Sequence, residues 1–204
     1  DEWPTYKQSF GYSLIDIDFE CMNTNSKGNS LFDKWNQFAL KIIPFMASGI
    51  KDGNIKVLLQ RLLEVQETEL DARNLLILDL MNSLLVPTSK YHHKEPGNKR
   101  RIIKTSISDA RKSFLHQVAS MNDLHTSIQI EIDNCYKEKK TLQPLICVVG
   151  VDFEIAKDFY VYYFNTYYKF SSIIRAVDVC FKIFQVFNLK YPIQSSLVWT
   201  FIQQ

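Results

Sequence analysis

A continuous apolar run near the start of the last third of the chain constrains the fold most. Residues 145–149 read LICVV and lie between Pro144 and Gly150. A run this short, without polar residues at alternate positions, is typical of a strand that is buried on both faces. We therefore predict a central strand here, and we expect the chain from Leu142 onward to organise the fold.

Two aromatic segments follow this strand. Residues 159–164 and 167–170 are rich in tyrosine and phenylalanine, and Asn165-Thr166 separates them. Aromatic segments joined by a short turn predict a β-hairpin. A helix is then expected from Ser171, with an end near Asn188, and a last helix carries the apolar residues Leu197, Val198, Trp199, Phe201 and Ile202.

The first half of the chain predicts helices. Between residues 31 and 86, apolar residues recur at spacings of three and four, which places them on one face of a helix. Three amphipathic helices are expected, of which Pro44 should kink or end the first and Pro87 should stop the third. Residues 1–30 predict an irregular arm with one short helix or strand.

These patterns predict an α+β protein with four segments. They are an N-terminal arm (1–30), a helical lobe (31–87), an exposed basic linker (88–104) without apolar periodicity, and an α+β lobe (105–204). The α+β lobe should hold a small sheet of about three to four strands covered by helices. Phe114 to Val118 fits either a strand or a helix; we favour a strand, because Ser120 starts a new helix.

Composition excludes some classes of function. The formal net charge is only +2, so contact with nucleic acid or an acidic membrane would need a local basic patch. No apolar run approaches the ~18 residues that span a bilayer, so we expect no membrane contact. The four cysteines are widely separated, which favours reduced core thiols inside a cell. The chain lacks an initial Met and ends abruptly, so we expect a fragment of a longer protein.

Four stretches of the sequence carry a family resemblance. They are TLQPLICVVG (141–150), AVDVCFKIF (176–184), NLKYP (188–192) and VWTFIQ (198–203). Over roughly residues 30–204 the chain resembles a recurrent family of animal proteins, abundant in insects, that occur in many near-copies and look transposon-derived or domesticated. Some members carry a sterile-alpha-motif domain elsewhere. The resemblance implies an intracellular protein, nuclear or cytoplasmic, from a mobile-element or genome-defence setting, and it brings no catalytic residues.

Motifs for catalysis, cofactors and metals are weak. Gly150 follows a strand, but no glycine-rich phosphate-binding turn follows it. His116 and His125 have no nucleophile or zinc ligand at a predictable place. The carboxylate pairs Asp16 with Asp18 and Asp152 with Glu154 would share a face if they lay on strands, which is the arrangement of a metal-dependent nuclease. No third ligand is evident, so we predict no catalytic residue, no cofactor and no metal.

Two surfaces are candidates for binding. The first is basic and would contact phosphates, with a solvated linker or a nuclear-import signal as alternatives; its residues are Lys99, Arg100, Arg101, Lys104, Arg111 and Lys112. The second is the aromatic hairpin, which would bind a partner if one face stays exposed and would otherwise belong to the core. Its residues are Tyr160, Tyr162, Tyr163, Tyr167 and Tyr168.

These features lead to two functional hypotheses. The first is a non-catalytic interaction module that binds a protein partner or a second copy of itself, through the open edge of the sheet or a groove between the lobes. The second is a nucleic-acid-binding module that uses the basic linker. A metal-dependent nuclease ranks third.

Overall fold

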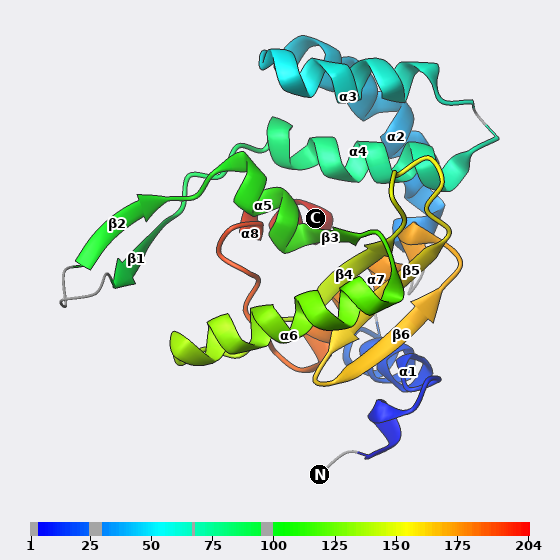
Figure 1. Ribbon diagram of the computed structural model, residues 1–204. Coiled ribbons are helices and arrows are strands. Elements are labelled where there is room, and N and C mark those ends of the chain that lie inside the picture. Colours follow the sequence, from blue (N-terminus) through cyan, green and yellow to red (C-terminus); the bar gives the residue numbers. More distant parts are fainter. Residues whose placement is uncertain (1–3, 25–29, 67, 95–99) are drawn as a thin grey trace.

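The computed structural model describes residues 4–24, 30–66, 68–94 and 100–204. Its centre is a four-stranded sheet with helices on both faces (Figure 1), which confirms the predicted α+β class. Helix α6 (Met121–Lys137) packs on one face. Helix α7 (Ile173–Val186) packs on the other, and α1 (Tyr12–Met22) and α4 (Leu70–Leu84) pack against α7.

The sheet has the strand order β3-β4-β5-β6. Its strands are β3 (Leu115–Val118), β4 (Leu145–Val149), β5 (Asp158–Tyr163) and β6 (Thr166–Phe170). Strand β3 runs parallel to β4 and is connected to it through α6, whereas the other neighbours are antiparallel. The predicted central strand is confirmed, because β4 is paired on both sides.

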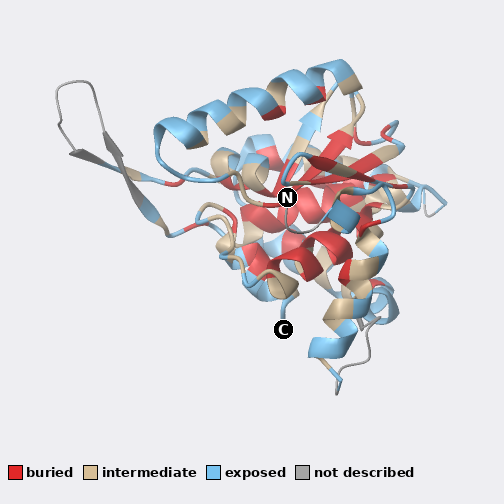
Figure 2. Cartoon of the chain, turned by 90° about the horizontal axis from the view of Figure 1, so that it is seen from below, coloured by how far each residue is buried: buried red, intermediate tan, exposed pale blue. Residues whose placement is uncertain are grey.

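Alternation along the strands explains why the apolar run is continuous. Ile146 and Val148 of β4 belong to the larger hydrophobic core, which includes α7, while Leu145 and Cys147 belong to a smaller core under α6. Each face of β4 therefore meets a helix, and a polar residue on either face would be buried without a partner. Figure 2 shows this layering, with buried residues concentrated in the sheet and the helices beside it and exposed residues along the outer side of α6.

The predicted hairpin of β5 and β6 is present, but its turn lies one residue earlier than expected. Phe164 and Asn165 occupy the two loop positions and have left-handed φ angles of 46° and 63°. Two successive left-handed residues form the turn that matches the twist of a two-stranded ribbon. Asn tolerates this conformation well, and the sequence offered no glycine to mark it.

The N-terminal half contributes α2 (Ser30–Gly49), α3 (Gly53–Glu64) and α4. Helix α3 begins at the cap residue Asp52, whose side chain accepts a hydrogen bond from the Asn54 amide at 2.9 Å. Helix α2 continues through Pro44 to Gly49, so the proline does not end it. Helix α4 is buried on every side from Leu75 to Ser83, because α2, α3, α5 (Ile107–Phe114) and α7 surround it.

The predicted helical and α+β lobes share one hydrophobic core. The larger core joins Trp35, Leu59 and Leu76 from the first half to Phe159 and Val177 from the second. The N-terminal arm contains the 3-10 turn η1 (Pro4–Lys7) and α1, which packs along α7. The chain ends with α8 (Ser196–Ile202), whose Trp199 is buried.

Two ambiguous regions differ from the expectations. Residues 107–118 form α5 and then β3, so the helical and the strand periodicities are each correct over part of the segment. The predicted irregular linker contains a second sheet, in which β1 (Lys90–Lys94) pairs with β2 (Arg100–Lys104). Among the ribbon side chains that the structure describes, Lys90 and residues 102–104, none belongs to the two hydrophobic cores, which agrees with the lack of apolar periodicity in the sequence.

Candidate nucleic-acid interface

The two-stranded sheet of β1 and β2, called the ribbon below, projects from the body of the protein (Figure 1). Its base is fixed by Ser89 and Thr105. The Thr105 amide donates to the Ser89 carbonyl oxygen at 3.1 Å, and the two hydroxyl groups are hydrogen-bonded at 2.8 Å. Thr105 is buried, so the ribbon leaves a rigid part of the fold.

The register of the ribbon brings like charges together. Lys90 is opposite Lys104, and Lys94 is opposite Arg100. Directly opposed residues share a face, so Lys90 and Lys104 lie on the same face of the ribbon. Like charges directly opposite each other destabilise a strand pair. A bound polyanion would offset this repulsion, because its negative charges would attract both basic side chains.

The predicted basic residues divide into three groups. Lys99 lies outside the described residues. Arg100, Arg101 and Lys104 lie on β2, and Lys104 is exposed. Lys112 is exposed on α5.

Arg111, also on α5, is held by an aspartate of α4, and its role as a phosphate ligand stays a prediction. Its Nε donates to Asp79 Oδ1 at 2.6 Å, and its Nη2 forms an ion pair with the other oxygen of the same carboxylate. The Asp79 side chain is buried; burial raises the pKa of its carboxyl group, and the hydrogen bonds from Arg111 oppose that shift. Arg111 therefore ties α5 to α4.

Lys90 and Lys94 of β1 were left out of the site by sequence reasoning. Lys90 is exposed at the start of β1 and pairs with Lys104. The basic character of residues 88–104 was visible in the sequence. The opposition of Lys90 and Lys104 was not visible, because it depends on a register that no apolar pattern reveals.

The tyrosines of the second candidate surface are mostly buried, which favours the alternative in which the hairpin belongs to the core. Tyr160, Tyr162 and Tyr168 are 8%, 4% and 1% exposed. Tyr160 and Tyr162 lie in the core under α6, and Tyr167 packs at its margin. Tyr168 and Tyr163 point to the α7 side, where the Tyr168 hydroxyl donates to the Tyr6 carbonyl oxygen. Helices cover both faces of β5 and β6, so these tyrosines stabilise the core.

The first predicted carboxylate pair is separated by the helix on which it lies. Asp16 and Asp18 are on α1, where residues two apart face different directions. Asp16 binds Arg175 and Lys182 of α7, whereas Asp18 accepts a hydrogen bond from the Tyr6 hydroxyl. That bond, with burial, raises the pKa of Tyr6 to about 12.

The second carboxylate pair is used by an arginine. Asp152 and Glu154 both bind Arg61 of α3, at 2.5 Å and 2.9 Å. The hydrogen bond from Arg61 lowers the pKa of Asp152. Within residues 4–24, 30–66, 68–94 and 100–204, no group of three or more His, Cys, Asp or Glu side chains could hold a metal ion.

A charged pocket of about 400 Å³ opens between α1, α2 and α7. Its cations, Arg175 and Lys182, are already paired with Asp16 and Asp178. The remaining lining groups are Glu20, Phe32 and Asp33. These ion pairs neutralise the two cations and connect α1 to α7. The lining residues of the pocket therefore include no activated catalytic group.

The histidines and cysteines have structural surroundings. His116 is hydrogen-bonded to the Ser127 hydroxyl, and burial lowers its pKa. Cys147 and Cys180 are buried, and burial raises the pKa of Cys147 to about 12. A thiol with a raised pKa is a poor nucleophile at neutral pH. His125 packs edge-on against Tyr167.

Comparisons with known proteins found no similar protein. No protein family, curated protein or solved structure matches the chain. The resemblance to transposon-like animal proteins therefore stays a prediction. In the described part of the chain, no helix combines the length and the apolar character needed to cross a bilayer.

Proposed function

We propose that this chain is a non-catalytic nucleic-acid-binding module that contacts the phosphate backbone with its ribbon. The observation that carries the proposal is that Lys90 lies directly opposite Lys104 on one face, in a register that also pairs Lys94 with Arg100. This arrangement is unfavourable for the isolated strands and becomes favourable beside a regular row of negative charges.

The shape of the ribbon favours a nucleic acid over other anions. Each strand has five residues. Two charged rungs four residues apart are separated by about 13 Å along the strand. A two-stranded ribbon also has the width that the major groove of a DNA duplex admits. Contacts of this kind position a protein on the backbone and carry little sequence preference.

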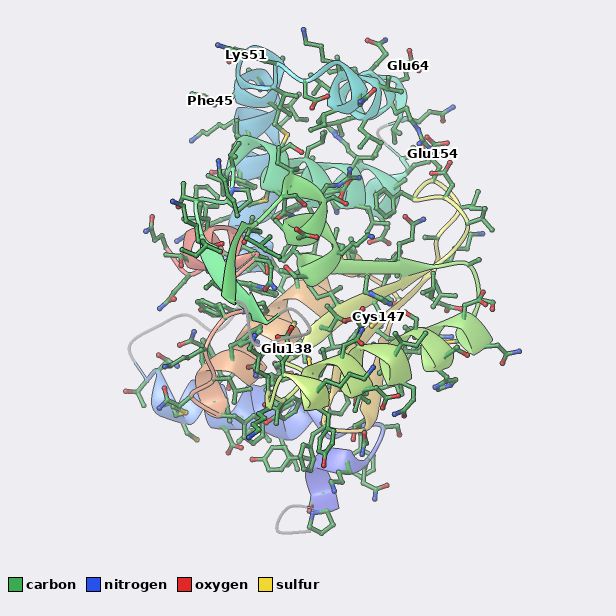
Figure 3. The ribbon with its side chains drawn as sticks, turned by 60° about the vertical axis from the view of Figure 1, so that its left-hand side comes forward. Phe45, Lys51, Glu64, Glu138, Cys147 and Glu154 are labelled. Atoms are coloured by element: carbon green, nitrogen blue, oxygen red, sulfur yellow. The ribbon has the colours of Figure 1, made fainter. Side chains whose placement is uncertain are left out.

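The test is the salt dependence of binding to a labelled random-sequence DNA duplex. Lys90→Ala with Lys104→Ala should weaken binding, and the slope of log K against log salt should fall by about 0.9 for each phosphate that the variant no longer neutralises. Lys51→Ala with Lys56→Ala is the matched control, because both lysines are exposed and Lys51 lies far from the ribbon (Figure 3).

Two results would contradict the proposal. One is a ribbon variant that binds the duplex with the same affinity and salt slope as the control variant. The other is an unmodified chain that shows no salt-sensitive binding to DNA or RNA. Circular dichroism of each variant shows whether the fold is retained.

A second candidate is a protein interaction or assembly module. It is favoured by apolar side chains that α2 and α3 leave exposed, namely Leu40, Phe45, Val57 and Leu63. Figure 3 shows Phe45 at the periphery of the molecule. With a second copy as the partner, light scattering should show a dimer that Phe45→Asp dissociates. A monomer at every concentration would exclude assembly with itself.

We do not propose a nuclease activity, because both candidate carboxylate pairs are occupied by Arg61, Arg175, Lys182 and Tyr6. A nucleic-acid-binding role agrees with the mobile-element or genome-defence setting that the resemblance implies. It also agrees with a location in the nucleus or the cytoplasm.

A further inference from the structure

We infer that the nucleic-acid surface does not end at the ribbon but continues to the C-terminal end of α6, where Lys137, Lys139 and Lys140 provide a second row of phosphate contacts. The inference rests on the proposed function and adds a binding site to it. The ribbon alone would touch a short stretch of backbone, whereas two separate basic elements would fix the direction of a duplex across the protein.

The C-terminal end of α6 and the ribbon lie on the same side of the molecule in two different views (Figures 1 and 3), and the label of Glu138 marks that end. The three lysines are exposed, and they outnumber the acidic residue among them, Glu138. Lys140 binds Glu138 at 2.6 Å, but both side chains are exposed, so solvent screens this ion pair. In the described part of the chain, Lys137 and Lys139 have no ion-pair partner.

The backbone of Lys139 has an unusual conformation. Its φ angle is 56°, in the left-handed region. The Lys140 amide donates to the Cys135 carbonyl oxygen at 2.9 Å, and the Lys139 amide donates to the Tyr136 carbonyl oxygen at 3.0 Å. These two bonds close the helix in the motif in which glycine is usually found at the left-handed position.

A lysine at this position is less stable than a glycine would be, because its Cβ atom is strained in a left-handed conformation. The attraction of positive charge to a helix C-terminus explains a lysine in the last turn, such as Lys137. It does not explain a charged residue at the one position that favours glycine. A lysine side chain that binds a ligand at this position would account both for the strained left-handed backbone and for the positive charge.

The decisive variant is therefore Lys139→Gly. It relieves the backbone strain, so the melting temperature should stay the same or rise. It also removes a charge, so affinity for a labelled random-sequence duplex should fall, with a salt slope lower by about 0.9. Opposite effects on stability and binding separate a ligand contact from a structural role. Lys137→Ala and Lys140→Ala in the same chain should lower affinity and slope further.

The controls separate this inference from the proposed function. If the Lys90 and Lys104 variant loses binding while the Lys137, Lys139 and Lys140 variant matches the Lys51 and Lys56 control, the ribbon binds DNA and the α6 site is wrong. If neither variant differs from the control, both proposals fail. If a polyglutamate peptide competes as well as the duplex does, the surface fits an acidic protein, and the nucleic-acid assignment is overturned at both sites.

Discussion

Lys182 shows how charge is handled inside this protein. Its side chain is 3% exposed, and its Nζ lies 2.8 Å from Asp16 Oδ1 and 2.8 Å from Asp178 Oδ2. Burial raises the pKa of the Asp178 carboxyl group, and the hydrogen bond from Lys182 opposes that shift. The network links α1 to α7 through charged groups that are mostly buried and are paired with one another.

Lys182→Met should destabilise the fold by about 3 kcal/mol, because it leaves buried carboxylates with one cation fewer while it keeps most of the side-chain volume. Urea unfolding monitored by circular dichroism measures the change. Lys169→Met is the matched control: Lys169 also pairs with an aspartate, Asp158, but this ion pair is exposed and should contribute little. Equal effects of the two changes would show that burial of the network is not what stabilises it.

His116 should make stability depend on pH. Burial lowers its pKa below the usual 6.5, opposed by the charge of Glu131 and assisted by that of Lys112. The unfolded chain therefore takes up the proton first as the pH falls through about 6.5, and the free energy of unfolding decreases by up to about 1.4 kcal/mol per pH unit.

His116→Gln should remove this part of the pH dependence. The other titrating groups, Asp79 and Asp178 among them, are common to both proteins, so the difference between the two curves isolates the histidine. Unfolding free energies at several values between pH 5 and pH 8 measure it. Parallel curves for the two proteins would refute the assignment.

At the level of single residues, the sequence revealed side-chain chemistry but not partners. Asp178 and Lys182 are four apart in a helix that was correctly predicted, so their mutual contact could be inferred. Asp16 lies far from both in sequence, in an arm for which either a short helix or a strand was expected. Its helical position, and therefore its partner, depends on the packing of α1 against α7.

Among the elements, the ribbon is expected to contribute little to the stability of the fold. Its described side chains, Lys90 and residues 102–104, belong to neither hydrophobic core, and Ser89 and Thr105 already meet at its base. Replacing residues 90–104 with Asn-Gly, a sequence that forms tight turns, should preserve the rest of the fold.

The shortened chain should therefore unfold cooperatively within a few degrees of the full chain, by differential scanning calorimetry, and should bind DNA weakly. Loss of the cooperative transition would mean that the ribbon stabilises the core. If the shortened chain kept full affinity for DNA, the binding site would lie outside the ribbon.

Element prediction succeeded where one residue pattern decides the outcome. The run at 145–149 favoured a buried strand, and Ser120 caps α6 as expected, by accepting a hydrogen bond from the Asp123 amide. It was less decisive at Pro44, where a kink or an end was expected and α2 does not end, because its apolar face packs on α4. At the tyrosines the pattern left open whether the sheet face is exposed or covered, because their burial depends on helices that come from distant parts of the chain.

The whole molecule should unfold in one step. The predicted division into two lobes would allow two transitions, but Trp35, Leu59 and Leu76 share a core with Phe159 and Val177. Neither half can lose its structure without exposing apolar surface of the other.

Fluorescence of the tryptophans and far-ultraviolet circular dichroism should therefore give coincident denaturation curves. Trp35 and Trp199 report on the two halves of the sequence, and both are buried. Curves with separate midpoints would show that the halves are independent.

The complete burial of the middle of helix α4 also has a consequence for the synthesis of the protein on the ribosome. In the folded protein it is buried on every side from Leu75 to Ser83, and one of the elements that cover it, α7, begins at Ile173. That helix is synthesised roughly 90 residues after α4 is complete, which corresponds to about 5 to 20 seconds of translation. During this interval the nascent chain presents an unpaired hydrophobic helix, which is a binding site for chaperones and a point at which truncated chains would aggregate.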